Sequence, residues 1–236
     1  MNGNWIDVTT NDGTMGAYLV TPPAGSGPGI VMLQEIFGVN AAMIAKAERF
    51  AEAGYTVLVP DVFWRMKPRV DLGYTEDERT QAFGYMQELD FAKAVDDIGT
   101  AFEALEAHDA ATGAPSIIGY CLGGKLAVLA GHKSGRASAV VSFYGVKLDD
   151  NIDLLTSMPC PIALHIGDQD THIPLDVAHR LEDALAPVLN ADVYIYPGAQ
   201  HGFFNAVRDS VYHQTSADLA WERTQSVLPS TEAVPA

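Results

Sequence analysis

Cysteine is scarce in this chain: Cys121 and Cys160 are the only two among 236 residues. Two cysteines can form at most one disulfide, which excludes a fold stapled by several bridges. Their separation also excludes a Cys-x-x-Cys redox or zinc motif. No histidine pair or Cys/His cluster has the spacing of metal ligands, so we expect neither a metal nor a cofactor.

Basic residues are also scarce, with 14 Lys and Arg against 30 Asp and Glu, a net charge of −16. This balance argues against nucleic acid or an anionic membrane as a partner. Long apolar runs are missing, and residues 1–14 lack an apolar signal core, so we expect no membrane span and no secretory signal. We therefore expect a soluble protein of the reducing cytoplasm. The sequence does not indicate its oligomeric state.

The chain is 48% hydrophobic and long enough for one sizeable domain, predicted over 1–228 with a frayed tail at 229–236. Short apolar runs alternate with helical patterns, which predicts an α/β fold: a mostly parallel central sheet with helices on both faces. The predicted strands are 29–33, 56–59, 116–118, 138–144, 162–166 and 193–196, and the predicted helices are 41–53, 78–88, 91–108, 125–130, 175–186 and 211–228. Ligands of such sheets bind beyond the carboxyl ends of the strands.

One of these ends carries the most informative motif, Gly-Tyr-Cys-Leu-Gly-Gly at residues 119–124. It matches a nucleophile elbow, a sharp strand-to-helix turn of the form Gly-x-nucleophile-x-Gly, with cysteine at the nucleophile position. Gly119 and Gly123 fit a turn so tight that a Cβ would block it. The turn would expose the Cys121 sulfur at a helix N-terminus, where the helix dipole favours a thiolate.

Three other interpretations of this motif exist. A phosphate-binding loop fits the run from Gly119 to Lys125, but such a loop requires Ser or Thr next, and Leu126 follows. A redox thiol would need a nearby cysteine, and none is present. A buried structural cysteine in a glycine-rich turn stays open at this point, since free cysteine is among the most buried residue types.

A thiol nucleophile needs a base and an orienting acid. His201 follows the predicted strand 193–196, and Asp170 follows the predicted strand 162–166. The order nucleophile, acid, histidine is that of α/β-hydrolases. Asp168 competes for the acid position, but we interpret it as a turn former. The sequence suggests no role for the other histidines: His108, His132, His165, His172, His179 and His213.

Four segments together resemble the dienelactone hydrolase (carboxymethylenebutenolidase) family across nearly the whole chain: 34–40, 119–124, 167–170 and 199–203. The resemblance implies the α/β-hydrolase fold and a triad of Cys121, His201 and Asp170. It also implies that the Glu35 carboxylate contacts the resting cysteine and takes part in forming the thiolate. The oxyanion hole would be the backbone N–H groups of Ile36 and Leu122.

The substrate pocket departs from the family pattern. Arg79 matches one of two arginines that hold a substrate carboxylate in the family, but Asn205 occupies the second position and Arg208 is out of register. Phe83 and Met86 replace an expected tyrosine and tryptophan, and the resemblance also assigns Phe37 and Phe203 to the pocket. The resemblance therefore implies hydrolysis of a small ester or lactone through a thioester, with the particular substrate left open.

Two other functions use the same residues. An acyltransferase or thioesterase would keep the triad and differ only in its substrates. A non-catalytic binding protein on a hydrolase scaffold would usually lack one triad residue, and here all three are present.

Overall fold

The structure, a computed structural model, describes residues 3–231. These residues fall into two compact units. The described part of Met1–Ser116 and Pro229–Ala236 forms unit 1, and Ile117–Leu228 forms unit 2. The single domain expected over 1–228 stays a prediction, and residues 232–236 of the expected tail lie outside the described residues.

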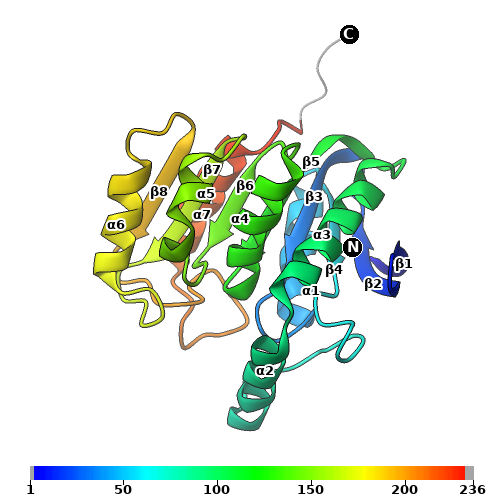
Figure 1. Cartoon of the computed structure of the whole chain (residues 1–236), viewed down its shortest axis with the longest axis horizontal. Coiled ribbons are helices and arrows are strands. Elements are labelled where there is room, and N and C mark those ends of the chain that lie inside the picture. The colour runs from blue at the N-terminus through cyan, green and yellow to red at the C-terminus, as the bar shows by residue number, and fades with distance from the viewer. Residues whose placement is uncertain (1–2, 232–236) are drawn as a thin grey trace. The chain divides into compact units, whose positions relative to one another are not determined.

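Unit 1 pairs its strands in the order β1-β2-β4-β3. The pairs β1/β2 and β2/β4 are antiparallel, whereas β3/β4 is parallel. Figure 1 shows α3 on the near face of these strands and α1 on the far face. The elements are β1 (Asn4–Thr10), β2 (Gly13–Val20), β3 (Gly27–Leu33), α1 (Ala41–Glu52), β4 (Thr56–Pro60), α2 (Glu76–Glu88), α3 (Phe91–Glu106) and β5 (Ala111–Tyr120), whose last four residues belong to unit 2.

Unit 2 pairs its strands in the order β5-β6-β7-β8, all parallel. The central strands β6 and β7 are completely buried, as expected of a parallel sheet covered on both faces. Figure 1 shows α4 and α6 on the near face and α7 on the far face. The elements are α4 (Leu122–Ser134), β6 (Val140–Phe143), α5 (Ile152–Thr156), β7 (Ile162–Gly167), α6 (Leu175–Leu185), β8 (Ala191–Tyr196) and α7 (Gln214–Val227).

The predicted α/β class with mostly parallel strands is confirmed, and each predicted strand and helix is present. The expectation that strands and helices alternate along the whole chain is wrong at its start, where β1 and β2 form an antiparallel hairpin with no helix between them. The β1 side chains are mostly exposed or half-buried, so an apolar pattern is weak there. The short α5 is missed for lack of length, and α7 begins at Gln214 instead of residue 211. No helix within residues 3–231 combines the length and apolar character that a bilayer crossing requires.

A histidine inside unit 2 contributes to the core of the fold. His165 on β7 is completely buried, with Nδ1 at 2.8 Å from the Tyr196 hydroxyl and Nε2 at 3.1 Å from the Thr224 hydroxyl. Burial, together with the nearby charge of Arg223, lowers the pKa of His165 to about 3. The ring is therefore neutral in the folded protein and joins β7, β8 and α7 through hydrogen bonds to both nitrogens.

This neutral histidine predicts a pH-dependent stability. Because the folded pKa of His165 lies below that of an unfolded histidine, its contribution is complete above about pH 6.5 and is lost as the pH falls toward the folded value. Between pH 8 and pH 5 we expect the wild type to lose about 2 kcal/mol of unfolding free energy through this residue. Urea unfolding of His165→Gln should lack that loss, whereas His179→Gln, at an exposed α6 position, should keep it. Identical pH dependence of wild type and His165→Gln would contradict the assignment.

Candidate active site

The backbone at Cys121 adopts a conformation that few non-glycine residues tolerate. Its φ is 56° and its ψ is −115°, directly between the last residue of β5 and the first residue of α4. A Cβ on Gly119 would overlap the carbonyl oxygen of Gly123, so the turn needs glycine there. The Cys121 N–H donates to the Phe143 carbonyl at 3.0 Å, which fixes the turn to β6. This is the geometry of a nucleophile elbow.

The strain at Cys121 bears on the interpretation of the motif. A residue in a disfavoured region costs on the order of 1–3 kcal/mol, and such strain concentrates at functional sites. Cys121 is half-buried, not enclosed in the core, and both cysteines are free thiols. A packing role explains neither the strain nor the partial exposure, so the structural-cysteine interpretation is weakened.

The loops after β7 and β8 bring Asp170 and His201 together. Nδ1 of His201 lies 2.7 Å from Oδ2 of the buried Asp170 carboxylate. The second oxygen, Oδ1, accepts the backbone N–H groups of His172 at 2.7 Å and Ile173 at 3.1 Å. Asp168 instead accepts the Gly198 N–H at 2.7 Å, which is a turn-forming contact. The structure therefore pairs the histidine with Asp170 and not with Asp168.

The electrostatics around His201 favour its charged form. Burial lowers the pKa of His201, but the negative charge of a Cys121 thiolate and the hydrogen bond to Asp170 outweigh burial and raise that pKa to about 10. Nε2 is buried, and within the described residues no hydrogen bond of ordinary distance and angle reaches it. A protonated His201 would carry an N–H on Nε2 that can donate to a reacting group.

Two rings that the sequence did not indicate flank this imidazole. Tyr144, directly after β6, has a φ of 39° and packs edge-on to His201 with 5.0 Å between ring centroids. His172 packs edge-on at 4.6 Å. Both residues follow strands at the edge where ligands bind, which is the one signal that could have marked them. Together they restrict the orientation of the catalytic candidate.

The loop after His201 is folded tightly back on itself. Gly202 has a φ of 86°, and a Cβ there would lie 3.3 Å from Nη1 of the half-buried Arg208. The predicted pocket residues Phe203 and Asn205 are both fully buried. Phe203 packs on Tyr144, with 5.6 Å between ring centroids. A guanidinium therefore lies beside the residue that follows His201, although the register position of the expected arginine holds Asn205.

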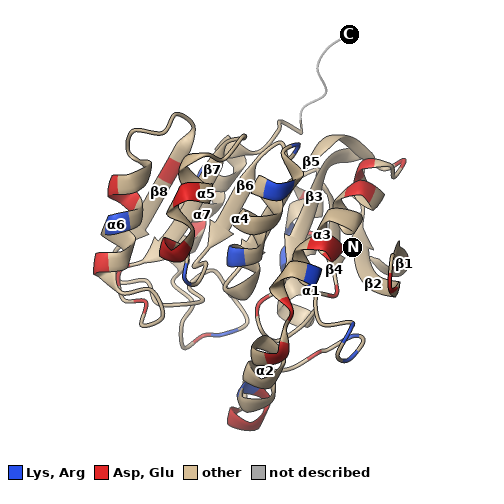
Figure 2. Cartoon of the chain, in the orientation of Figure 1, with Lys and Arg blue, Asp and Glu red and all other residues tan. Residues whose placement is uncertain are grey.

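The remaining predicted site residues belong to unit 1. Glu35, Ile36 and Phe37 lie in the loop after β3, beginning two residues past its end, and are 4–5% exposed. Arg79 is exposed on α2, where Phe83 and Met86 are half-buried. The spacing of these three puts them on one face of the helix. Figure 2 shows that α2 is otherwise acidic, carrying Glu76, Asp77, Glu78 and Glu88.

Among residues 3–231 there is no group of three or more His, Cys, Asp and Glu side chains arranged to hold a metal ion. Unit 2 thus combines a strained cysteine at the N-terminus of α4 with an imidazole that is oriented by a buried carboxylate. These are the parts of a nucleophilic acyl-transfer site.

Known proteins share this architecture. The dienelactone hydrolase family model matches residues 15–231. The carboxymethylenebutenolidase of Pseudomonas putida is 32% identical over 225 residues, 94% of each chain. Carboxymethylenebutenolidase 1 of Cupriavidus pinatubonensis is 29% identical over 230 residues, 97% of each chain. A crystal structure from Klebsiella pneumoniae, described provisionally as a dienelactone hydrolase, has a TM-score of 0.83 at 23% identity and covers 96% of this chain and 97% of its own, which supports the fold.

With a match of this length and an elbow, acid and histidine in hydrolase order, the chain belongs to the dienelactone hydrolase family and is a carboxylic ester or lactone hydrolase of the α/β-hydrolase fold.

Proposed function

We propose that the enzyme cleaves a small ester or lactone through a thioester on Cys121. The observation that carries this proposal is the strained elbow at Cys121 beside an imidazole that is raised in pKa and bonded to Asp170. A strained cysteine and a buried, oriented imidazole are both costly to maintain, and nucleophilic catalysis uses both.

In the proposed mechanism, the Cys121 thiolate attacks the carbonyl carbon and forms a tetrahedral oxyanion. The carbon–oxygen bond to the leaving group then breaks, and Nε2–H of His201 gives its proton to the departing oxygen. Neutral His201 next takes a proton from water as the water attacks the thioester. The carbon–sulfur bond breaks, the acid is released, and the thiolate–imidazolium pair is restored.

Glu35, Ile36 and Leu122 enter this mechanism from the family resemblance. The N–H groups of Ile36 and Leu122 would stabilise the oxyanion, and Leu122 supports this role as the first residue of α4, whose leading N–H groups lack partners within the helix. Glu35 would help to form the thiolate when substrate binds. Because the proposed nucleophile is a free thiol, we also propose a reducing compartment, the cytoplasm, as the location.

The substrate is proposed to carry a carboxylate held by arginine. Arg79 and Arg208 are the candidates, and Arg208 is supported by the nearness of its guanidinium to Gly202, next to His201. An acidic protein of net charge −16 repels anions at long range, so a local cation is needed to bind one. Phe37, Phe83, Met86, Phe203 and Asn205 would shape the rest of the pocket.

A substrate panel tests this assignment. Arg79→Ala and Arg208→Ala should each raise KM for a carboxylate-bearing dienelactone about tenfold or more, because a charge-assisted hydrogen bond is lost. Neutral p-nitrophenyl acetate should be hydrolysed at the wild-type rate. Arg180→Ala is the control for lost charge, since Arg180 pairs with Asp149 and Asp176 on the surface of unit 2. Equal effects on both substrates would show that neither arginine binds a substrate carboxylate.

The same panel separates hydrolysis from acyl transfer. If an added alcohol captures the acyl group in preference to water, the enzyme is an acyltransferase. If no substrate of the panel turns over, the binding-protein alternative gains support.

A further inference from the structure

The segment that carries Glu35 and Ile36 is bound to a second stretch of unit 1. We call residues 34–40 the oxyanion segment and residues 61–74 the strap. The Phe37 carbonyl accepts the Leu72 N–H at 3.0 Å, and Gly38 forms an isolated antiparallel bridge with Asp71. The Phe37 ring packs edge-on to Tyr74 with 4.7 Å between centroids. The oxyanion segment thus takes its conformation from contacts outside its own sequence.

Gly38 shows how closely the two stretches approach. Its φ is 80°, and a Cβ on it would overlap the carbonyl oxygen of Val70. Only glycine satisfies both the positive φ and the close approach. The backbone of the oxyanion segment therefore has little freedom as long as the strap keeps its position.

Two buried side chains tie the ends of the oxyanion segment to the strap. At the start, Oε1 of Gln34 accepts the Val62 N–H at 3.3 Å. At the end, Nδ2 of Asn40 donates to the Leu72 carbonyl at 2.9 Å and to the Tyr74 hydroxyl at 3.3 Å. Gln34 and Asn40 are 0% and 4% exposed, and their bonds to Val62 and Leu72 are buried, where losing a hydrogen bond is expensive.

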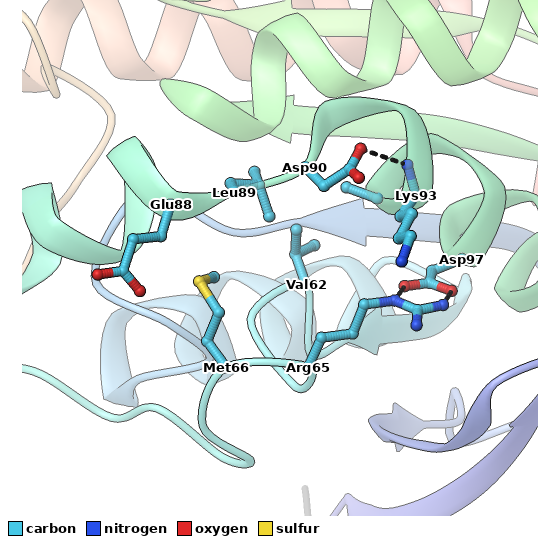
Figure 3. Close-up of a pocket in the computed structure, with 9 residues that line it drawn as sticks. Val62, Arg65, Met66, Glu88, Leu89, Asp90, Lys93 and Asp97 are labelled. Carbon is cyan, nitrogen blue, oxygen red and sulfur yellow. Dashed lines mark hydrogen bonds and ion pairs between the residues drawn. The ribbon is translucent and has the colours of Figure 1, made fainter.

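The strap itself is anchored to the rest of unit 1. Figure 3 shows the guanidinium of Arg65 paired with the Asp97 carboxylate of α3, through two bonds of 2.8 Å. The Trp64 indole N–H donates to the same carboxylate at 2.8 Å. Within the strap, Asp61 accepts the Phe63 N–H at 3.1 Å and the Arg69 N–H at 2.5 Å. Because these bonds tie the strap to α3 and cross-link it internally, we expect it to be a rigid support and not a free loop.

From these contacts we infer that Asn40 is a positioning residue: through the strap it holds the Ile36 N–H where the oxyanion forms. The inference rests on the proposed function, which assigns that N–H to the oxyanion hole. Oxyanion donors act in the transition state, so misplacing one lowers kcat more than it changes KM.

Asn40 also caps α1, because its Oδ1 accepts the Met43 N–H at 3.2 Å. The test has to separate capping from positioning. Asn40→Asp and Asn40→Ser both keep a capping oxygen and both lose the amide donor to Leu72 and Tyr74. Asp keeps the volume, whereas Ser avoids a buried charge, so at least one variant should fold.

We expect both variants to lower kcat for p-nitrophenyl acetate about 10- to 100-fold, with KM within about twofold of wild type. Alkylation of Cys121 by iodoacetamide uses no oxyanion hole and should keep its wild-type rate. Asp90→Ala is the matched control: it removes the cap of α3 in the same unit and should lower stability but not kcat.

Wild-type kcat in the Asn40 variants would overturn the inference. So would a kcat loss no larger than that of Asp90→Ala at equal stability, or a parallel loss of alkylation. The proposed nucleophile is tested separately by Cys121→Ala, so failure of the two proposals gives different results.

Discussion

Replacing Cys121 by alanine is expected to lower hydrolysis of p-nitrophenyl acetate by at least about 10⁴-fold while the protein stays folded. In the proposed mechanism the thiol supplies the attacking atom, so its loss removes the acyl intermediate. Far-UV circular dichroism and the unfolding midpoint should stay near wild type, since the side chain is half-buried and the change removes one atom. Retained hydrolysis would overturn the assignment.

Cys160 provides the matched control. Burial raises the pKa of its thiol to about 11, so it carries almost no thiolate at neutral pH. Cys160→Ala should therefore hydrolyse the ester at the wild-type rate.

Replacing Cys121 by serine tests whether the site requires a thiol. Although serine is the usual nucleophile in this turn, we expect Cys121→Ser to lose on the order of 10³-fold in kcat. The proposed mechanism starts from an ionised nucleophile beside His201, and an alcohol ionises far less readily than a thiol. If serine works as well as cysteine, the role proposed for Glu35 in forming a thiolate is wrong.

Asp170→Asn is expected to lower kcat by roughly 10³- to 10⁴-fold, the second large effect. The reason lies in the hydrogen bonds of the carboxylate. Oδ1 accepts two backbone N–H groups, from His172 and Ile173, so an asparagine must keep its single oxygen there. Its NH₂ group then faces Nδ1 of His201, which requires the imidazole to keep its proton on Nε2 and destabilises the charged form.

Asp168→Asn is the control for this prediction. Asp168 accepts one N–H, from Gly198, and asparagine can accept it equally well. Steady-state kinetics of the two variants should differ by orders of magnitude. If Asp168→Asn were the more damaging change, the acid would be misassigned.

The parts of the candidate site that depend on short-range sequence patterns could be predicted from the sequence. Gly119, Cys121 and the strand before them predict the elbow, and the structure shows why glycine is needed: a Cβ on Gly119 would overlap the Gly123 carbonyl oxygen. Asp170 and His201 could be predicted because each follows a parallel strand, and such strand ends meet at one edge of a sheet.

Contacts between distant segments were not predictable in the same way. Tyr144 and His172 flank His201 because of side-chain directions that sequence spacing does not give. The strap over the oxyanion segment depends on Asn40 bonding a carbonyl more than 30 positions away. The hairpin of β1 and β2 was missed because its first strand buries little and lacks apolar alternation.

The proposed thioester on Cys121 can be trapped and identified. His201→Gln should acylate with p-nitrophenyl acetate yet fail to activate water, so the intermediate should accumulate. Rapid acid quench, proteolysis and mass spectrometry should then find an acetyl group on the peptide containing Cys121, released by hydroxylamine. An acetyl group on another side chain, or no acetyl group on Cys121 after His201→Gln has released a burst of p-nitrophenol, would contradict a thioester on Cys121.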